Sequence, residues 1–288
     1  MNINCGGRLI DLSEPKIMGI LNITPDSFYD GGKYINRETI SKRANEIIAQ
    51  GATIIDVGAY SSRPGAIDIS SSEEKKRLDI ALDQIRKDFP DAIISVDTFR
   101  ADVAEYVIEH YDVDIINDIS AGIVDTRILE VIAYYHVPYI MMHMQGTPQT
   151  MQNNPFYKDV VADIIYYFSE RLRKTAFLGI PDVIIDPGFG FGKTIDHNYE
   201  ILANLDAFKI LQKPILVGLS RKSMIYKLLN KTPKQSLAGT ISLNTIALLK
   251  GANILRVHDV EEAADCIAIF KKFSQFKSFE YNNLFDLE

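Results

Sequence analysis

Short apolar runs rich in β-branched residues recur along the chain, and each is followed by a longer stretch whose apolar residues return every three or four positions. The short runs predict strands at 17–21, 53–57, 93–96, 114–116, 139–142, 183–185, 214–217 and 253–257. The longer stretches predict helices at 37–50, 73–89, 102–111, 125–135, 159–177, 199–211, 236–250 and 260–273, with a short helix at 224–229. Strands and helices therefore alternate along the whole sequence.

This alternation predicts an α/β fold with a parallel sheet and right-handed crossovers, and eight such units predict closure into a (β/α)8 TIM barrel. A doubly wound open sheet is the alternative. It is less favoured because no Gly-x-Gly-x-x-Gly turn follows the first predicted strand. The sequence has no linkers, low-complexity tracts or breaks in composition, so we expect a single domain over residues 1–288.

Polar residues gather where the predicted strands end. They are Asn22, Asp56, Asp97, Asn117, Asp118, His143, Asp186, Arg256 and His258. Active sites of such barrels are built at the C-terminal ends of the strands. A random scatter of polar residues would also fall in the helices and the opposite loops, so the clustering itself predicts a site at this end of the barrel.

The segment 183–193 contains the most informative of these strand ends. Asp186 follows three β-branched residues, and a carboxylate at the end of an apolar strand is costly to bury unless it is paired. No arginine or lysine follows before Lys193, so we expect a ligand with two parallel N–H donors, such as a guanine-like ring edge. Glycines at 188, 190 and 192 allow close approach, and Phe189 and Phe191 are available to cover a flat molecule. An ordinary strand-end turn is the alternative.

Two connections are longer than a barrel needs, at 22–32 and 59–72. Both are rich in Gly, Pro and Ser, and we expect them to close over a bound ligand, with plain solvated connections as the alternative.

An anion site is expected from the last two strands. Lys222 lies at the start of the short helix after the seventh strand, and Arg256 and His258 lie on one face of the eighth. An arginine beside a histidine suits phosphate, although a solvated lysine and a structural histidine are the alternatives. His143 and His197 lack such neighbours and are predicted to be structural.

Composition and charge exclude several classes of function. The chain has 47% hydrophobic and 24% charged residues, as globular proteins do. Its net charge of −7 and pI near 5.3 argue against nucleic-acid or anionic-membrane surfaces. Cys5 and Cys266 lie far apart without metal-ligand spacing, so neither a disulfide framework nor a zinc site is predicted. The polar segment 1–12 and the lack of a long apolar run predict a cytoplasmic protein.

Taken together, the motifs resemble the dihydropteroate synthase family from end to end. They are Met18–Phe28, Ser62–Ala66, Ser95–Thr98, Asn117–Asp118, Met142–Gly146, Asp186–Lys193, Ser220–Ser223 and Arg256–His258. The resemblance implies condensation of 6-hydroxymethyl-7,8-dihydropterin diphosphate with 4-aminobenzoate to give 7,8-dihydropteroate and pyrophosphate for folate synthesis. It also implies a (β/α)8 barrel, a homodimer, Mg²⁺ as cofactor and sensitivity to sulfonamides.

The resemblance also assigns roles to residues, of which Asp97, Asp186, Lys222 and Arg256 are the expected catalytic ones. Pterin would be bound by Asp97, Asn117, Asp186 and Lys222, and its pocket lined by Met142 and Phe191. Diphosphate would be held by Asn22, Arg256 and His258, with Asn22 acting through Mg²⁺. Aminobenzoate would lie against Phe28, Ser62, Pro64, Phe189 and Ser223, and Arg63, Ile119 and Gly218 are further expected substrate-binding residues.

The expected mechanism is dissociative: the carbon–oxygen bond breaks before the amine attacks, and carboxylates favour the pterin methylene cation.

The sequence departs from the family pattern at Tyr60, where bacterial relatives commonly have a glutamate, whereas Ser62 keeps the hydroxyl of their threonine. Two rival functions remain open. One is a methyltetrahydrofolate-corrinoid methyltransferase-like domain, which needs no diphosphate clamp. The other is a non-catalytic pterin-binding paralogue, which would have been favoured by loss of Asn22, Asp97, Lys222 or Arg256.

Overall fold

The computed structural model describes residues 1–23, 29–30, 34–62, 67–147, 149–151 and 154–276. Within these residues, eight parallel strands form one sheet in the order β10-β9-β8-β7-β6-β3-β12-β11. Their bounds are β3 (Lys16–Asn22), β6 (Ile54–Gly58), β7 (Ile93–Asp97), β8 (Ile115–Asp118), β9 (Tyr139–Met142), β10 (Val183–Asp186), β11 (Leu216–Val217) and β12 (Ile254–Val257). A parallel bridge between Ile185 and Ile215 joins the two edges and closes the barrel. The predicted TIM barrel is confirmed.

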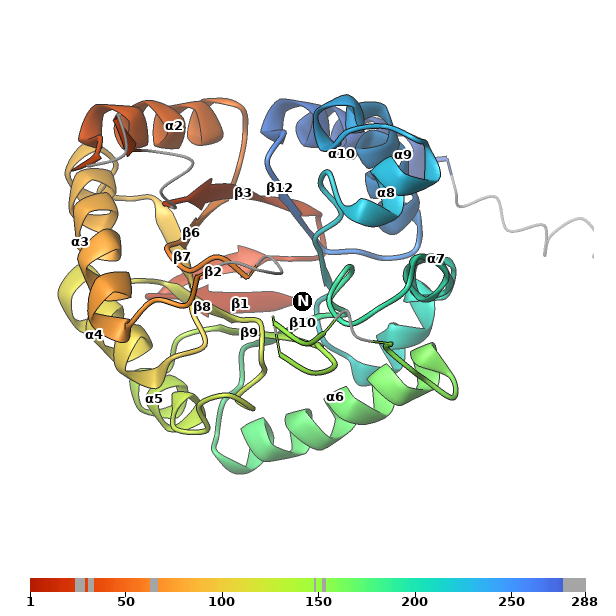
Figure 1. Ribbon diagram of the computed structural model, residues 1–288, viewed down its shortest axis with the longest axis horizontal. Coiled ribbons are helices and arrows are strands. Elements are labelled where there is room, and N and C mark those ends of the chain that lie inside the picture. The colour runs from red at the N-terminus through yellow and green to blue at the C-terminus, as the bar shows by residue number, and fades with distance from the viewer. Residues whose placement is uncertain (24–28, 31–33, 63–66, 148, 152–153, 277–288) are drawn as a thin grey trace, which may run out of the picture.

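Helices surround the strands in a ring, as Figure 1 shows. They are α2 (Arg37–Ala49), α3 (Ser71–Asp88), α4 (Ala101–Tyr111), α5 (Ile128–Tyr135), α6 (Val160–Phe177), α7 (Ile195–Ala203), α8 (Ser223–Leu228), α9 (Leu237–Leu249) and α10 (Val260–Ser274). Short 3₁₀ helices, η1 (Leu205–Leu211) and η2 (Pro233–Gln235), lie between some of them.

The helix predicted at 199–211 is wrong in its bounds. The α-helix begins at Ile195, because Thr194 accepts a hydrogen bond from the His197 backbone N–H and the His197 ring accepts one from Thr194. Continuing as η1, the chain tightens into a 3₁₀ helix after Asn204. His197 therefore has the structural role predicted for it.

Side chains along each strand point alternately toward the barrel axis and toward the surrounding helices. Residues two apart on a strand face the same side, so every second residue points inward. The outward set packs with the helices in one large core, which includes Ile55 of β6, Val96 of β7 and Leu255 of β12. The inward set begins with an apolar layer at the N-terminal end of the barrel, formed by Met18, Ile54, Ile115, Ile140, Ile184, Leu216 and Ile254.

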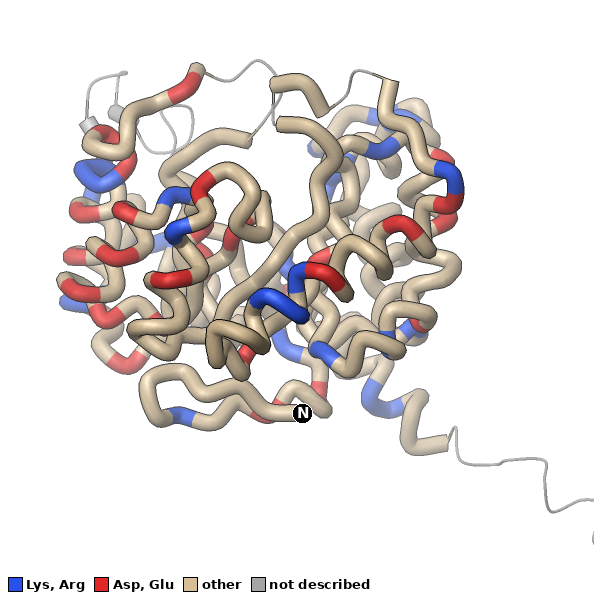
Figure 2. The backbone as a smooth tube through the Cα atoms, turned by 90° about the horizontal axis from the view of Figure 1, so that it is seen from below, with Lys and Arg blue, Asp and Glu red and all other residues tan. Residues whose placement is uncertain are grey.

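An N-terminal hairpin, absent from the sequence prediction, covers that apolar layer. Its strands β1 (Asn2–Cys5) and β2 (Arg8–Asp11) are joined by Gly6 and Gly7, both with positive φ, as a two-residue hairpin turn requires. Apolar residues of this hairpin belong to the same cluster as the inward layer. Figure 2 shows the hairpin lying across one end of the molecule, where it closes the barrel.

The predicted long connection at 22–32 contains β4 (Tyr29–Asp30), which pairs antiparallel with β5 (Tyr34–Ile35) just beyond it. Acidic and basic residues are interspersed along the outer helices in the view of Figure 2.

The N-terminal hairpin seals the barrel at its N-terminal end, and the polar strand ends lie at the other end, which we call the mouth.

Candidate active site

The mouth is built from the inward positions that follow the apolar layer. Two residues further along each strand, the same face carries Ile20, Asp56, Ser95, Asn117, Met142, Asp186, Gly218 and Arg256. The inward face therefore changes from apolar to largely polar over only two residues of each strand. Parallel pairing of all neighbouring strands therefore brings these side chains to the same end of the barrel, as the sequence predicts.

Arg256 of β12 lies between two carboxylates from different strands. Its Nε donates to Asp56 Oδ2 at 2.7 Å, and its Nη2 lies 2.6 Å from the same oxygen. Nη2 also donates to Asp97 Oδ2 at 2.8 Å. Both carboxylates raise the pKa of Arg256, although burial opposes them. Asp56, to which the sequence analysis gave no role, is fully buried and holds the guanidinium in place.

Asn117 and Asp97 complete the side of the mouth nearest Arg256. Asn117 Nδ2 donates to Asp56 Oδ2 at 3.3 Å, so Asp56 receives both a cation and an amide. Burial raises the pKa of Asp97 to about 7, the Arg256 charge lowers it, and the Asp56 carboxylate raises it further. Asp97 is thus a carboxylate poised to gain or lose a proton near neutral pH.

Asp186 and Lys222 form the opposite side of the mouth. Burial raises the pKa of Asp186, and the charge of Lys222 is the strongest influence in the other direction. Asp186 Oδ1 accepts a hydrogen bond from the Gly188 N–H at 2.8 Å, while Lys222 Nζ donates to the Phe189 carbonyl oxygen. Burial lowers the pKa of Lys222 to about 8 despite the nearby Asp186. No arginine or lysine lies close to Asp186 in the sequence, but the fold brings Lys222 near enough for its charge to lower the pKa of Asp186.

The loop at 187–193 packs directly on the backbone that follows β9. A Cβ at Gly188 would lie 1.9 Å from the His143 carbonyl oxygen, and one at Gly192 would lie 2.6 Å from that of Gln145. Lys193 is buried beneath the loop and donates to the carbonyl oxygens of His143, Gly188 and Phe191 at 2.9 to 3.2 Å. Lys193 therefore holds the loop against its neighbour.

His143 has the structural role that the sequence predicts. Its Nδ1 lies 3.0 Å from Lys193 Nζ, and burial together with that charge lowers its pKa to about 2. The ring is therefore neutral and accepts from the lysine.

An apolar wall lines the mouth beside the carboxylates. It comprises Phe99, Ile119, Met142, Met144 and Met151, with Tyr60 and Phe191 packed against it. Lys222 Nζ lies 4.8 Å from the centre of the Phe191 ring. Phe189 requires a correction, because its side chain is fully buried in the outer core and does not line the mouth. The turn at Gly188 and Gly190 directs the two phenylalanines to different sides, which residue type alone did not show.

His258 and Ser220 lie beside Arg256 where β11 and β12 end. Ser220 Oγ is 3.1 Å from His258 Nδ1 and accepts from the His258 backbone N–H at 3.3 Å. Burial and the Arg256 charge lower the pKa of His258 to about 4. Arg221 donates to both carboxylate oxygens of Asp259, which fixes the backbone that carries Lys222 and the first residue of α8, Ser223.

The remaining predicted residues fall at the rim or outside the described chain. Asn22 ends β3, with its Oδ1 close to Gly58, and Ser62 is half-buried in the connection after β6. Gly218 follows β11, where a Cβ would lie 3.9 Å from both Lys222 Nζ and Arg256 Cβ. Phe28, Arg63 and Pro64 lie outside the described residues.

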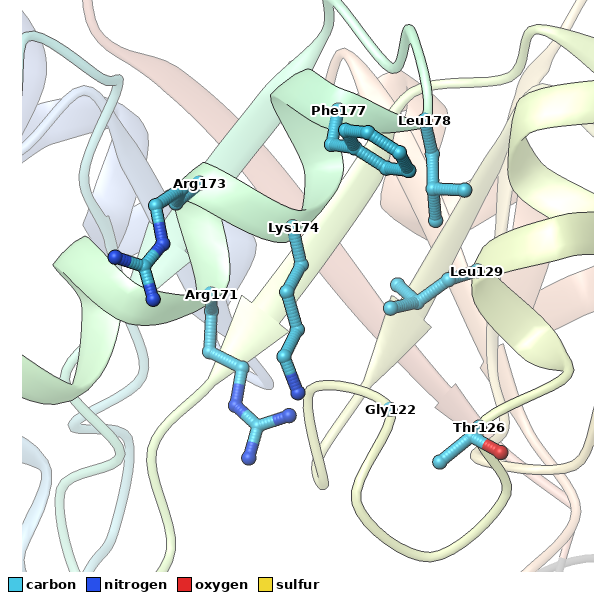
Figure 3. A pocket seen from close by; sticks show the side chains of 8 residues that line it. All are labelled: Gly122, Thr126, Leu129, Arg171, Arg173, Lys174, Phe177 and Leu178. Atoms are coloured by element: carbon cyan, nitrogen blue, oxygen red, sulfur yellow. The ribbon is translucent and has the colours of Figure 1, made fainter.

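A separate hollow of about 460 Å³ lies away from this constellation, and Figure 3 shows the side chains that line it. These are Gly122, Thr126, Leu129, Arg171, Arg173, Lys174, Phe177 and Leu178, from α6 and the residue that follows it, α5, and the segment that precedes α5. None of the predicted site residues lines it. We therefore place the candidate site at the mouth, where the perturbed carboxylates and the partly buried cations converge.

The mouth suits a flat ligand with N–H donors and an attached anion. Asp97 and Asp186 can accept from such donors, the apolar wall can cover the ring, and Arg256, Lys222 and His258 supply cationic or donor groups. Among the described residues, no three His, Cys, Asp or Glu side chains form a metal-binding group. Mg²⁺ usually keeps several waters and binds one or two protein oxygens plus substrate phosphates, so the donor set fits an ion that arrives with a diphosphate.

Comparisons with known proteins agree with this chemistry. A family model described as pterin binding enzyme matches residues 18–258. The chain is 44% identical over 271 residues to the dihydropteroate synthase of Escherichia coli K12, covering 93% of this chain and 95% of that protein. Against the dihydropteroate synthase of Haemophilus influenzae it is 41% identical, with 94% and 98% covered.

Two solved structures are similarly close. The dihydropteroate synthase of Yersinia pestis in complex with a sulfonamide drug has a TM-score of 0.88 and 39% identity, covering 96% of this chain and 99% of that one. That of Xanthomonas albilineans with 4-aminobenzoic acid has a TM-score of 0.87 and 34% identity, with 95% and 98% covered.

Proposed function

This chain belongs to the dihydropteroate synthases, a family of pterin-binding enzymes, and from that premise we propose how its own residues share the reaction. The enzyme is a transferase that condenses 6-hydroxymethyl-7,8-dihydropterin diphosphate with 4-aminobenzoate, giving 7,8-dihydropteroate and pyrophosphate in folate biosynthesis. The observation that carries the residue roles is the polar layer at the mouth, where Arg256 lies between Asp56 and Asp97 and faces the Asp186–Lys222 side.

Pterin recognition falls to the carboxylates and to Asn117. A pterin presents paired N–H donors on one edge, and Asp186 at the end of β10 accepts them, with Asp97 and Asn117 on the other side of the ring. Met142, Ile119 and Phe191 cover the ring faces from the apolar wall. Lys222 contributes a donor close to Phe191.

The diphosphate is held by Arg256, His258 and Asn22. In the structure, Arg256 is paired with carboxylates, so the anion competes with Asp97 for the guanidinium when substrate binds. Mg²⁺ is proposed to bind Asn22 Oδ1 together with the diphosphate, where it would neutralise charge on the leaving group. Arg256 would also bind the diphosphate, because the planar donors of a guanidinium suit phosphate oxygens.

The chemical step is dissociative. The bond between the pterin methylene carbon and the diphosphate oxygen breaks first, and its electron pair leaves with pyrophosphate. The aromatic amine nitrogen of 4-aminobenzoate then attacks the methylene carbon and releases a proton to solvent. Asp97 and Asp186 favour the transient cation, which is delocalised into the pterin ring, so no covalent intermediate with the protein is required.

The aminobenzoate site is proposed on the side of the mouth nearest Ser62 and Ser223, with Phe28, Arg63 and Pro64 contributing from segments outside the described residues. The Xanthomonas albilineans relative is solved with 4-aminobenzoic acid and the Yersinia pestis relative with a sulfonamide. We expect sulfonamides to compete with 4-aminobenzoate here.

The enzyme is further proposed to be a cytoplasmic homodimer. In the described part of the chain, each helix is too short or too polar to cross a bilayer. At the end of α10, Phe273 and Phe276 are exposed, which supports an apolar surface for a second copy. Light scattering should give twice the chain mass of 32.4 kDa.

Pyrophosphate release from purified protein tests the function. The protein is given dihydropterin diphosphate and Mg²⁺, with and without 4-aminobenzoate. Amine-dependent release that yields dihydropteroate is the expected result. Tight pterin binding without amine-dependent release would instead indicate a methyltransferase-like domain or a non-catalytic paralogue.

A further inference from the structure

Arg100 joins three segments beside the mouth without belonging to the substrate constellation. It immediately precedes α4, and its side chain is only 17% exposed. Its Nη2 donates to the Ile69 carbonyl oxygen at 2.7 Å and to Asp68 Oδ1 at 3.2 Å. Its Nη1 donates to Glu74 of α3, whose carboxylate is fully buried. One guanidinium thus ties the end of the β6–α3 connection to both α3 and α4.

The same guanidinium lies over Tyr60, at the other end of that connection. Its Cζ is 5.3 Å from the centre of the Tyr60 ring and 5.1 Å from that of Phe99. Tyr60 meets Phe99 edge-on, with ring centres 5.1 Å apart and planes at 88°. Gln149, from the connection after β9, donates to Tyr60 Oη at 3.3 Å. Tyr60 is therefore held by the connections after β7 and after β9.

These contacts bear on the position of Ser62. Tyr60 precedes Ser62 by two residues, while Asp68 and Ile69 lead into Ser70, whose side chain caps α3. Both described ends of the β6–α3 connection are thus held by Arg100. The ring of Tyr60 also packs on the apolar wall, so the connection starts from a fixed point on the rim of the mouth.

We propose that Arg100 is a positioning residue for the aromatic amine: by holding Tyr60 and the segment at Asp68 and Ile69, it fixes Ser62 at the rim. This inference rests on the proposed function, because Ser62 has its role in the aminobenzoate site. The planar fork of an arginine is needed, since it bonds a carbonyl and two carboxylates in its plane while presenting its face to aromatic rings. A lysine offers one point charge and would keep only part of this set.

The position of Arg100 predicts which substrate is affected. Its side-chain hydrogen bonds go to Asp68, Ile69 and Glu74, whereas the pterin-side carboxylates Asp97 and Asp186 have their own partners. Loss of Arg100 should therefore weaken binding of the amine more than binding of the pterin.

Steady-state kinetics with both substrates provide the test. Arg100→Gln should raise KM for 4-aminobenzoate about tenfold, because Ser62 would no longer be held at the rim, with KM for the pterin diphosphate changed less than about threefold. Arg100→Lys should fall between this variant and the wild type. Equal rises in both KM values, or an unchanged KM for the amine, would overturn the inference.

Arg86 offers a matched control. It is 19% exposed and is likewise held by carbonyl oxygens and a buried carboxylate, Asp114, but at the N-terminal end of the barrel. Arg86→Gln should lower Tm and leave both KM values unchanged. An increase in KM for the amine in this variant would show that general destabilisation, and not positioning by Arg100, causes the effect.

Tyr60→Leu keeps the inference testable if Arg100→Gln fails to fold. It should raise KM for the amine in the same direction, and an unchanged KM would contradict the proposal. Where Arg100→Gln also folds, the two changes in a double variant should be less than additive, because both remove the contact between Arg100 and Tyr60. Full additivity would contradict the proposal. Failure of the proposed function is distinguishable, since wild-type protein would then release no pyrophosphate in response to the amine.

Discussion

At the scale of single residues, Asp56 shows what sequence can and cannot reveal about the site. Its place at a strand end is visible in the sequence, and so is the arginine at 256. Their pairing is not visible, because it depends on barrel closure, which brings β12 beside β3 and β3 beside β6. The sequence therefore predicts which residue types reach the mouth, while their partners follow from strand register. The correction at Phe189 has a different cause, the loop turn at Gly188 and Gly190, which turns its side chain into the outer core.

Pterin binding should depend on pH through Asp97. Its pKa of about 7 means that the carboxylate form, which accepts pterin N–H groups, forms as pH rises through neutrality. Affinity for a bare dihydropterin, measured by calorimetry, should therefore rise as pH is raised through about 7. Folding stability should fall as pH rises from about 4, where Asp97 ionises in the unfolded chain, to about 7, because in this window only the folded state keeps the proton, and it should change no further above that pH.

Asp56→Asn tests the cause of this raised pKa. Removing the neighbouring negative charge lowers the pKa of Asp97, so the rise in affinity should move to lower pH. Asp114→Asn is the control, because Asp114 is also a buried carboxylate paired with arginines, but it precedes β8 at the other end of the barrel. A profile for Asp56→Asn that stays in place or moves to higher pH would refute the assignment.

At the scale of elements, the loop at 187–193 has both a predicted and an unpredicted feature. The glycines predict a tight turn, which is present, and close approach to a flat ligand, which stays a prediction. What they approach includes the backbone after β9, which lies more than forty residues earlier in the chain and is brought near by parallel pairing of β9 and β10. In the sequence, Lys193 is only the last residue of a motif. In the structure it is buried and donates to carbonyl oxygens on both sides of the contact between the loop and the backbone after β9. The local sequence therefore predicts the turn in this loop, whereas the pairing of β9 with β10 determines which backbone the loop packs against.

Gly188→Ala should therefore impair both folding and pterin affinity. Gly188 has φ +72°, and an added Cβ would lie 1.9 Å from the His143 carbonyl oxygen, so the loop must move away from β9. Gly179→Ala is a closely matched control, because Gly179 has φ +73° with nothing within 4 Å of the added Cβ. Each change carries a backbone cost of about 1–2 kcal/mol for the left-handed conformation.

The difference between the two variants measures the steric contact. Thermal denaturation should give a clearly larger loss of Tm for Gly188→Ala, and only that variant should bind a bare pterin more weakly. Equal losses in both would mean that backbone conformation alone accounts for these glycines, and that the loop does not need its contact with His143.

At the scale of the whole molecule, the alternating pattern was sufficient to predict the barrel and its eight-stranded parallel sheet. The N-terminal hairpin was missed, although Ile3 and Cys5 alternate before Gly6-Gly7 and an apolar pair follows. Its composition looks polar, and four-residue strands carry too weak a signal alone. Only the open apolar layer inside the barrel explains why such a short hairpin is stable.

The hairpin should stabilise the fold without affecting catalysis, because it covers the end of the barrel opposite the mouth. Ile3 is 1% exposed within the inner apolar cluster, whereas Leu9 on the same hairpin is 72% exposed. Ile3→Ala should lower the free energy of unfolding by about 2–5 kcal/mol in urea denaturation, and Leu9→Ala by less than about 0.5 kcal/mol. Both KM values should stay at wild-type levels in each variant under conditions where the protein is folded. If Ile3→Ala altered KM for the pterin diphosphate while folded, the two ends of the barrel would be coupled through the strands, and the separation between a stabilising end and a catalytic end would be wrong.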